Sequence, residues 1–203
     1  EEKRPVTFFF NGGPGASSAY LHVGAVGPKR VLFNSNGTLR KPPAELVANP
    51  ETWLTFSDLV FLDPIGTGFS RPIDEKEGKD KSGEKDDFWQ VNRDLESIGE
   101  FVRDFLSKEK RWSSPVFIAG KSYGGFRVAK LVRSLQESFG IGLNGAILIS
   151  PAFSLHDLDP DDYDFENWLD IFPSLVVSAC HHRKGRWASG GDVFYVCDAW
   201  VFF

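Results

Sequence analysis

The stretch that decides the fold spans residues 116–125 and reads VFIAGKSYGG. Its apolar start, Val116 to Ala119, predicts a short buried strand. Gly120-Lys121-Ser122-Tyr123-Gly124 follows as a G-x-S-x-G pattern. A helical pattern comes next, and its apolar positions share one face, namely Phe126, Ala129, Val132 and Leu135. The stretch therefore predicts a strand, a sharp turn that presents a serine, and a helix.

A G-x-S-x-G pattern between a strand and a helix is typical of the nucleophile elbow of α/β-hydrolases. The strained turn leaves no room for Cβ atoms on either side, which is why both flanking positions are glycine. The start of the following helix also turns its unpaired N–H groups toward developing negative charge. Ser122 is therefore predicted to be a nucleophile. The alternatives are a phosphate-binding turn or a structural serine, and no P-loop or dinucleotide pattern surrounds it.

A second glycine-rich segment, NGGPGASS at residues 11–18, follows the apolar run Val6 to Phe10, which is predicted to be a buried strand. In an α/β-hydrolase, the N–H of the residue after the nucleophile, here Tyr123, works with a second N–H from an earlier loop. Glycines let the loop backbone approach a ligand closely. Each such donor contributes roughly 2.7–4 kcal/mol to catalysis. The alternative interpretation is an ordinary loop.

The rest of the chain alternates between strand and helix signals. Leu59 to Leu62 and Ala146 to Ile149 are predicted strands, and residues 73–87 a solvated connection. Apolar residues at spacings of three and four predict a helix, namely Phe88, Val91, Leu95, Ile98, Val102 and Phe105. Arg30 to Phe33 and Thr38 to Arg40 flank Asn36-Gly37, which predicts a hairpin. The alternation indicates an α/β fold with a mostly parallel sheet and helices on both faces.

The character of the sequence changes after Ser154. Acidic residues then crowd one stretch, namely Asp157, Asp159, Asp161, Asp162, Asp164, Glu166 and Asp170. This stretch does not fit an EF-hand, because a loop begun at Asp157 lacks the glycine at its sixth position. A helix-like run is predicted from Pro173 to near Gly185, whereas residues 187–203 show no clear period. We expect 1–153 to be a core domain and 154–203 the start of an insertion with an uncertain tail.

Three ordered motifs together resemble the serine carboxypeptidase family, peptidase family S10. They are NGGPGASS at 11–18, FLDPIGTGFS at 61–70 and GKSYGG at 120–125, and their order and spacing match. The resemblance covers about residues 5–155 and, more loosely, 172–185. It implies the N-terminal part of an α/β-hydrolase fold with the start of a helical cap insertion. It also implies release of C-terminal residues through an acyl-enzyme on Ser122, with the N–H groups of Gly13 and Tyr123 as oxyanion hole.

The resemblance also implies a site for the carboxylate of the substrate. In the family this group is held by the first-motif asparagine, here Asn11, by the next residue, Gly12, and by a glutamate that precedes the nucleophile. That glutamate is replaced by Lys121, and a second family acid falls at Ala25. Two carboxyl groups hold a carboxylate only when protons are shared, whereas an ammonium pairs with it directly. Our hypothesis is that Lys121 binds a free C-terminus without needing acid; the alternative is that it points to solvent.

The general base is not found by this reasoning. The order in this fold is Ser, then Asp, then His, and the family's Asp and His lie beyond residue 203. His156, His181 and His182 are interpreted as surface or cap residues and His22 as a core or rim residue. We therefore expect the chain to be part of a longer protein, and this part alone to be nearly inactive.

Composition excludes several classes of protein. The formal net charge of -5 argues against nucleic acid as a partner, and no apolar run approaches the roughly 20 residues of a membrane span. The two cysteines, Cys180 and Cys197, could form a bridge or stay free, and free thiols are favoured. Neither a metal nor a cofactor is expected. Asn36-Gly37-Thr38 is a glycosylation sequon that turn chemistry explains equally well.

The sequence thus predicts part of a serine carboxypeptidase that acts on peptides with a free C-terminus. One alternative is an esterase or acyltransferase that uses the same elbow, and another is a non-catalytic remnant. Family habit implies a secreted, periplasmic or vacuolar location.

Overall fold

The computed structural model describes residues 3–72, 88, 90–154, 161 and 163–182 of the 203-residue chain. The chain divides into two compact units, residues 1–153 and 154–203. Within the described residues, no helix is both long and apolar enough to cross a membrane.

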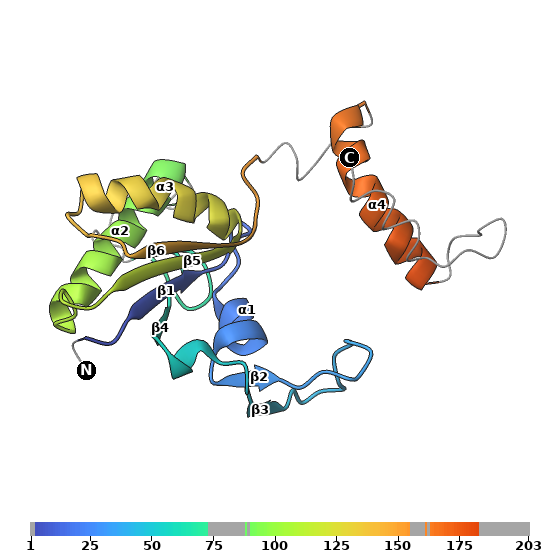
Figure 1. Ribbon diagram of the computed structural model, residues 1–203, viewed down its shortest axis with the longest axis horizontal. Helices are drawn as coiled ribbons and strands as arrows, with labels where there is room; N and C mark the ends of the chain where they lie inside the picture. Colours follow the sequence, from blue (N-terminus) through green and yellow to red (C-terminus); the bar gives the residue numbers. More distant parts are fainter. Residues whose placement is uncertain (1–2, 73–87, 89, 155–160, 162, 183–203) are drawn as a thin grey trace, which may run out of the picture. The chain divides into compact units, whose positions relative to one another are not determined.

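Unit 1 is built around a four-stranded parallel sheet with the strand order β4-β1-β5-β6 (Figure 1). The strands are β1 (Val6–Phe10), β4 (Asp58–Phe61), β5 (Val116–Ser122) and β6 (Gly145–Pro151). Phe10 lies opposite Gly120 in the register of β1 and β5. The chain segments after these two strands therefore leave the sheet side by side, which brings the first and third motifs together.

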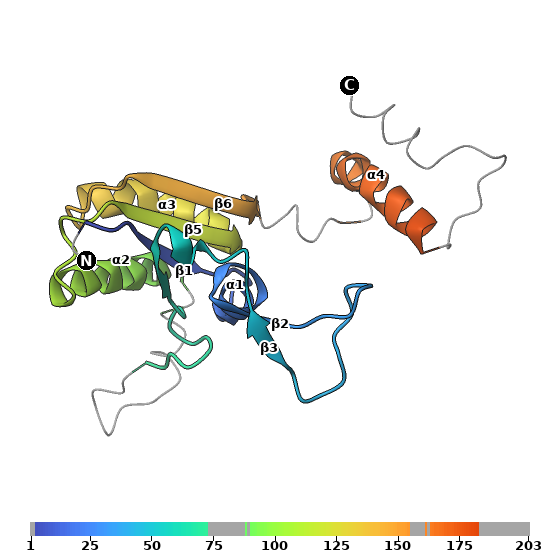
Figure 2. The ribbon, with the colours of Figure 1, turned by 60° about the horizontal axis from the view of Figure 1, so that its bottom comes forward.

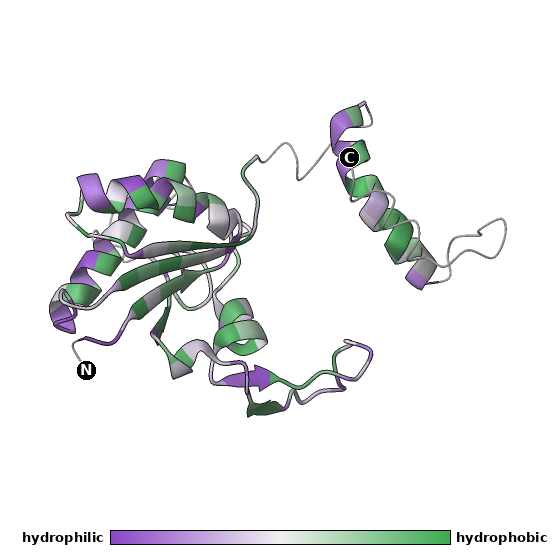
Figure 3. Ribbon diagram, viewed as in Figure 1, coloured by the Kyte–Doolittle hydropathy of each residue, from purple (hydrophilic) through white to green (hydrophobic). Residues whose placement is uncertain are grey.

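Alternation along β1 sends its side chains to two separate cores. Phe8 and Phe10 pack with α2 (Val91–Lys108) and α3 (Tyr123–Glu137) in the larger core. Phe9 points to the other face, where it packs with Leu21, Val26 and Ala119. Helices thus cover both faces of the sheet, with α2 and α3 on one side and the short α1 (Ala19–Leu21) on the other (Figure 2). In Figure 3, green apolar residues run along the strands of this sheet, whereas β2 (Lys29–Val31), which lies outside it, is purple.

The predicted strands and helices of unit 1 form, with two corrections. The hairpin prediction is wrong in its pairing: β2 (Lys29–Val31) pairs antiparallel with β3 (Leu46–Ala48), and only Phe33 and Leu39 bridge around the Asn36-Gly37 turn. The turn is too far along the chain from β2 to set its register. At the sequon, the side chain of Asn36 accepts hydrogen bonds from the backbone N–H and the hydroxyl of Thr38, which is turn chemistry.

The second correction concerns the buried face of α3. Val128, Leu131 and Leu135 are fully buried, whereas Ala129 is exposed and Phe126 and Val132 are only partly buried. The helix begins directly at Tyr123, and its inner stripe includes Arg127, whose charge the apolar pattern did not count. Because the sequence pattern counted only apolar residues, it left out Arg127, and the predicted face lies about one position along the helix from the observed one.

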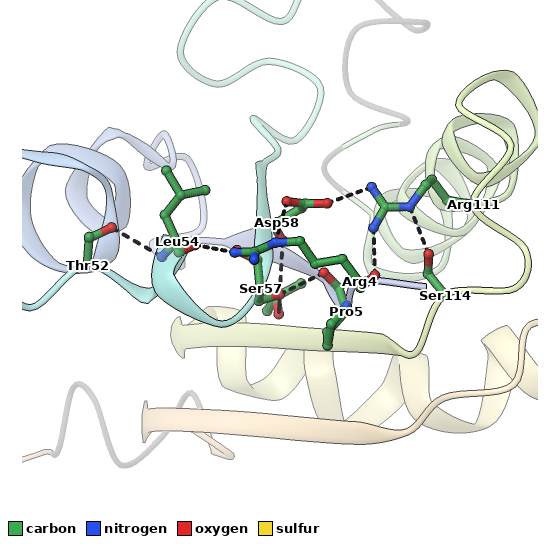
Figure 4. Close-up of polar contacts among 9 residues, drawn as sticks. Arg4, Pro5, Thr52, Leu54, Ser57, Asp58, Arg111 and Ser114 are labelled. Atoms are coloured by element: carbon green, nitrogen blue, oxygen red, sulfur yellow. Dashed lines mark hydrogen bonds and ion pairs between the residues drawn. The ribbon is translucent and has the colours of Figure 1, made fainter. Parts of the chain in front are cut away.

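A polar cluster joins the amino ends of β1, β4 and β5 (Figure 4). The Asp58 carboxylate accepts from Arg4 Nε at 2.8 Å and from Arg111 Nη1 at 2.7 Å, and Arg111 also donates to the Arg4 carbonyl at 2.7 Å. Partial burial acts to raise the pKa of Asp58, but hydrogen bonds and charge from Arg111 and Arg4 outweigh it. The pKa of this carboxyl therefore lies below its usual range.

Before α2 and α4 the chain falls partly outside the described residues, which include neither 73–87 nor 155–160. In unit 2, α4 runs over Phe165–His181. Pro173 lies inside this helix and does not open it, so the predicted start was eight residues too late. Asp164 lies just before the helix, and its carboxylate accepts from the Asn167 N–H at 3.3 Å, as a helix cap does. His156, Cys197, Gly185 and the tail from 187 lie outside the described residues, as does the side chain of Cys180.

Candidate active site

Ser122 lies at a strained turn between β5 and α3. Its φ is 59° and its ψ is -126°, in a region that non-glycine residues rarely adopt. The residue is half-buried, so its hydroxyl is not sealed inside the packed core. α3 begins at the very next residue, and this places the unpaired N–H groups of its first turn beside the serine.

The glycines around Ser122 are required by close backbone contacts. A Cβ on Gly120 would lie 2.0 Å from the carbonyl oxygen of Gly124. A Cβ on Gly124 would lie 2.6 Å from the carbonyl oxygen of Phe10. In both cases the obstacle is backbone, which cannot rotate away as a side chain can. The turn thus accepts only glycine at these two positions.

The first and third motifs touch at Gly12. A Cβ at this residue would lie 2.5 Å from the Tyr123 nitrogen and 2.7 Å from the Lys121 carbonyl oxygen. Gly13 follows with a φ of 107°, and it is exposed. The glycine loop therefore rests directly on the backbone of the elbow. The roles of the Gly13 and Tyr123 N–H groups as oxyanion donors stay predictions, and this packing favours them.

The second motif ties the loops together through Asp63. Its carboxylate accepts from the Ser18 N–H at 2.7 Å and from the Phe69 N–H at 3.3 Å. A Cβ on Gly68 would overlap this carboxylate, at 1.9 Å from Oδ2. These contacts join the first and second motifs. Asp63 holds the segment after β1 against the segment after β4.

Asn11 has an unfilled hydrogen-bonding capacity. The residue is 4% exposed, and its buried Oδ1 has no hydrogen-bond partner among the described residues. Buried side-chain oxygens are nearly always paired in folded proteins. The loop around it borders a small cavity lined by Pro14, Gly15, Ile65, Thr67, Phe88, Asp94, Tyr123 and Arg127.

Lys121 and Ala25 occupy the two positions where the resemblance implied acids. Lys121 is half-buried, and its ammonium lies 5.4 Å from the centre of the Tyr20 ring. With the described residues it forms no ion pair. Ala25 lies in the π-helical turn His22–Val26, and its carbonyl accepts from the Asn49 side chain at 2.7 Å. The ammonium therefore lies over an aromatic face, on the residue that precedes the predicted nucleophile in the chain.

Sequence reasoning missed the most buried charges near the site. Arg127 on α3 donates to Asp94 on α2 through Nε at 2.6 Å and Nη2 at 3.2 Å, and the two side chains are 3% and 7% exposed. Its remaining Nη1 donates to the Asn11 carbonyl at 2.7 Å. The available signal was position. Arg127 lies four residues before Leu131, and Asp94 four before Ile98, so both belong to the stripes that face the core.

The side chain of Tyr123 is packed behind the elbow. It is 5% exposed, and its ring stacks on Phe126. The Arg127 guanidinium carbon lies over the same ring, 4.9 Å from its centre. Burial raises the pKa of Tyr123 and the charge of Asp94 adds to this, whereas Arg127 opposes it. The phenol therefore stays neutral at physiological pH.

None of the histidines that the structure describes is assigned as the general base. His22 is exposed, and its ring stacks on Phe61 at 4.4 Å, as a rim residue. His181 and His182 lie in unit 2 and contact each other edge to face at 5.0 Å. In the described part of the chain, no three histidine, cysteine or acidic residues cluster as metal ligands would.

A serine at a positive-φ turn between a parallel strand and a helix, braced by a glycine loop, defines the class of α/β-hydrolases. The model of the serine carboxypeptidase family matches residues 1–157. This chain belongs to that family.

Similar proteins include several plant and fungal relatives. Serine carboxypeptidase-like 13 of Arabidopsis thaliana is 32% identical over 157 residues, which cover 74% of this chain and 33% of the relative. A pheromone-processing carboxypeptidase of Saccharomyces cerevisiae is 34% identical over 129 residues, which cover 60% and 16%. A carboxypeptidase Y homologue of Arthroderma benhamiae is 26% identical over 215 residues, which cover this whole chain and 38% of the relative.

Among solved structures, a prohormone-processing carboxypeptidase of Saccharomyces cerevisiae matches with a TM-score of 0.47 and 21% identity. The match covers 97% of this chain and 44% of that one. The chain thus spans about a third of the length of curated relatives such as the Arabidopsis protein.

Proposed function

We propose that the protein carrying this chain is a serine carboxypeptidase that hydrolyses the C-terminal peptide bond of peptides. The observation that supports this most is the contact between the two halves of the site. Ser122 is held at a positive-φ turn, and Gly12 rests on the Tyr123 nitrogen that follows it. This packing sets the backbone of the glycine loop against the elbow, as a site shared by the Ser122 hydroxyl and the N–H groups of Tyr123 and Gly13 would require.

In the proposed reaction, Ser122 Oγ forms a bond to the scissile carbonyl carbon while its proton passes to a general base. The carbonyl oxygen becomes an oxyanion that the N–H groups of Gly13 and Tyr123 stabilise. The C–N bond then breaks, the amine leaves with that proton, and water releases the acyl group. We propose that the general base and its acidic partner come from outside the described residues.

For the substrate carboxylate we propose a subsite made by Asn11, Gly12 and Lys121. Lys121 carries a positive charge next to the nucleophile and has no ion-pair partner among the described residues. An ammonium attracts an ionised carboxylate directly, so binding does not require a shared proton. The substrate is therefore a peptide with a free C-terminus, and activity should persist above the acidic range.

Labelling of the full-length protein with a fluorophosphonate probe tests the nucleophile. We expect covalent label on Ser122, loss of label in Ser122→Ala, and no change in Ser138→Ala, a control at the exposed end of the same helix. A folded protein that takes no label would favour the alternative of a non-catalytic remnant.

The pH dependence of kcat/KM tests the subsite. Peptide substrates with a free C-terminus should be cleaved up to neutral pH, and Lys121→Ala should raise KM for these but not for a p-nitrophenyl ester. An optimum at about pH 4–5 that survives in Lys121→Ala would contradict the role of the ammonium. Equal turnover of substrates with blocked and free C-termini would instead indicate an esterase or acyltransferase.

Family membership also leads us to propose a secreted, periplasmic or vacuolar location.

A further inference from the structure

We propose that Arg127 is a positioning residue that holds both halves of the oxyanion hole from behind. This inference rests on the proposed function, because a positioning role presupposes the oxyanion hole that Arg127 would hold. Arg127 is one turn into α3, and its buried guanidinium contacts Asp94 of α2 and the carbonyl of Asn11, just after β1. Its three contacts reach α2, the residue that follows β1, and the first residue of its own helix.

The first contact fixes the guanidinium itself. Asp94 accepts from Nε at 2.6 Å and from Nη2 at 3.2 Å, which is the two-pronged geometry that a carboxylate makes with arginine. Both side chains are more than nine-tenths buried. A lysine at this position cannot reproduce the planar fork. α2 therefore serves as the anchor from which Arg127 acts.

The second contact fixes the glycine loop. Nη1 donates at 2.7 Å to the carbonyl oxygen of Asn11, the residue directly after β1. In a trans peptide the carbonyl and the next N–H point in opposite directions, so this bond sets the plane of the Asn11–Gly12 peptide. Gly12 is the residue that rests on the elbow, and Gly13 follows it. The predicted Gly13 donor lies in the next peptide, so the Asn11 carbonyl positions it through the Gly12 backbone that rests on the elbow.

The third contact fixes the elbow residue that supplies the other donor. The guanidinium lies 4.9 Å from the centre of the Tyr123 ring, at a distance typical of a cation–π pair. One side chain therefore holds Tyr123 and the carbonyl before Gly12 at the same time. A shift of about 1 Å at a catalytic group costs on the order of 100-fold in rate.

Steady-state kinetics and amide hydrogen exchange of the full-length protein test this role. In Arg127→Lys we expect kcat to fall about 10- to 100-fold with KM for a peptide changed by less than about threefold. Exchange of the amides of residues 11–15 should accelerate, whereas that of residues 145–151 in β6 should not. The matched control is Arg133→Lys on the exposed side of α3, where Arg133 pairs with Glu137, and it should behave as wild type.

A folded Arg127→Lys protein with wild-type kcat and wild-type exchange at 11–15 overturns the proposal. Should this variant fail to fold, Arg127→Met combined with Asp94→Leu replaces the pair with apolar groups of similar size. A folded double variant with reduced kcat supports the role, and one with full kcat overturns it. If wild type takes no fluorophosphonate label, the proposed function fails, and the exchange at 11–15 alone then decides whether Arg127 holds the loop.

Discussion

Two arginine–aspartate clusters lie at opposite ends of the same sheet, and they differ mainly in their exposure to water. At the amino ends of the strands, Asp58 is 34% exposed and its partners Arg4 and Arg111 are 31% and 12% exposed. At the carboxyl ends, Asp94 and Arg127 are 7% and 3% exposed. Both clusters also bind a backbone carbonyl, of Arg4 in the first case and of Asn11 in the second.

Because they differ in burial, the two clusters differ in how much they stabilise the fold and in how they respond to pH. Water and salt screen the exposed cluster, so it contributes modestly to stability and responds to pH. In the buried cluster each charge depends on the other, because neither can be solvated once its partner is removed. The end of the sheet that carries the predicted chemistry is thus the end whose charges cannot rearrange.

The largest effect is expected from Arg127→Met alone. It leaves the Asp94 carboxylate buried without its partner and should lower the free energy of unfolding by about 3–5 kcal/mol. Urea denaturation of the full-length protein measures this. Adding Asp94→Leu should restore most of the loss, because no buried charge then remains. Equal stability of the single and double variants would mean that the lone Asp94 carboxylate costs little. The cluster would then be more accessible to water than the structure indicates.

A smaller loss is expected when the packing at the carboxyl end is changed without removing a charge. Gly120→Ala places a Cβ 2.0 Å from the Gly124 carbonyl oxygen and should cost about 1–3 kcal/mol. Gly142→Ala is the matched control, because nothing lies within 4 Å of the added Cβ. Thermal unfolding midpoints of the two variants provide the measurement, and similar midpoints would speak against a rigid elbow.

At the amino end, Asp58→Asn should cost about 1 kcal/mol at pH 7, since solvent screens the pair. The pKa of Asp58 is lowered in the folded protein, so its stabilisation is present above the unfolded pKa of about 3.9 and is lost as pH falls through the folded value. The stability difference between wild type and variant should therefore close as the pH is lowered below about 4. A difference that persists in strong acid would assign it to packing.

The smallest effect is expected on the outer face of α3. Arg133 and Glu137 form an exposed pair one turn apart, at 2.8 Å. Arg133→Ala should change the free energy of unfolding by about 0.3–0.5 kcal/mol, and less at high salt. A double-mutant cycle with Glu137→Gln isolates the pair. A coupling as large as that between Arg127 and Asp94 would remove burial as the explanation of the contrast.

Local patterns in the sequence predicted much of the fold. The run VTFFF predicted β1, and the G-x-S-x-G pattern predicted the turn between β5 and α3, because both depend on neighbours along the chain. The partner of β2 and the buried face of α3 were predicted wrongly. In each case the decisive contact comes from residues distant in the sequence, which a periodicity of apolar residues does not record.

The sequence by itself determined where glycine and serine must stand, because a strained turn is a local steric requirement that few residue types satisfy. The tertiary structure alone decided which charges meet. Arg127 reaches the Asn11 carbonyl across 116 positions of the chain, and Asp58 meets Arg111 across 53. Such pairs arise only when the parallel strands bring distant segments together at the two ends of the sheet, and only at the carboxyl end is the pair also removed from water.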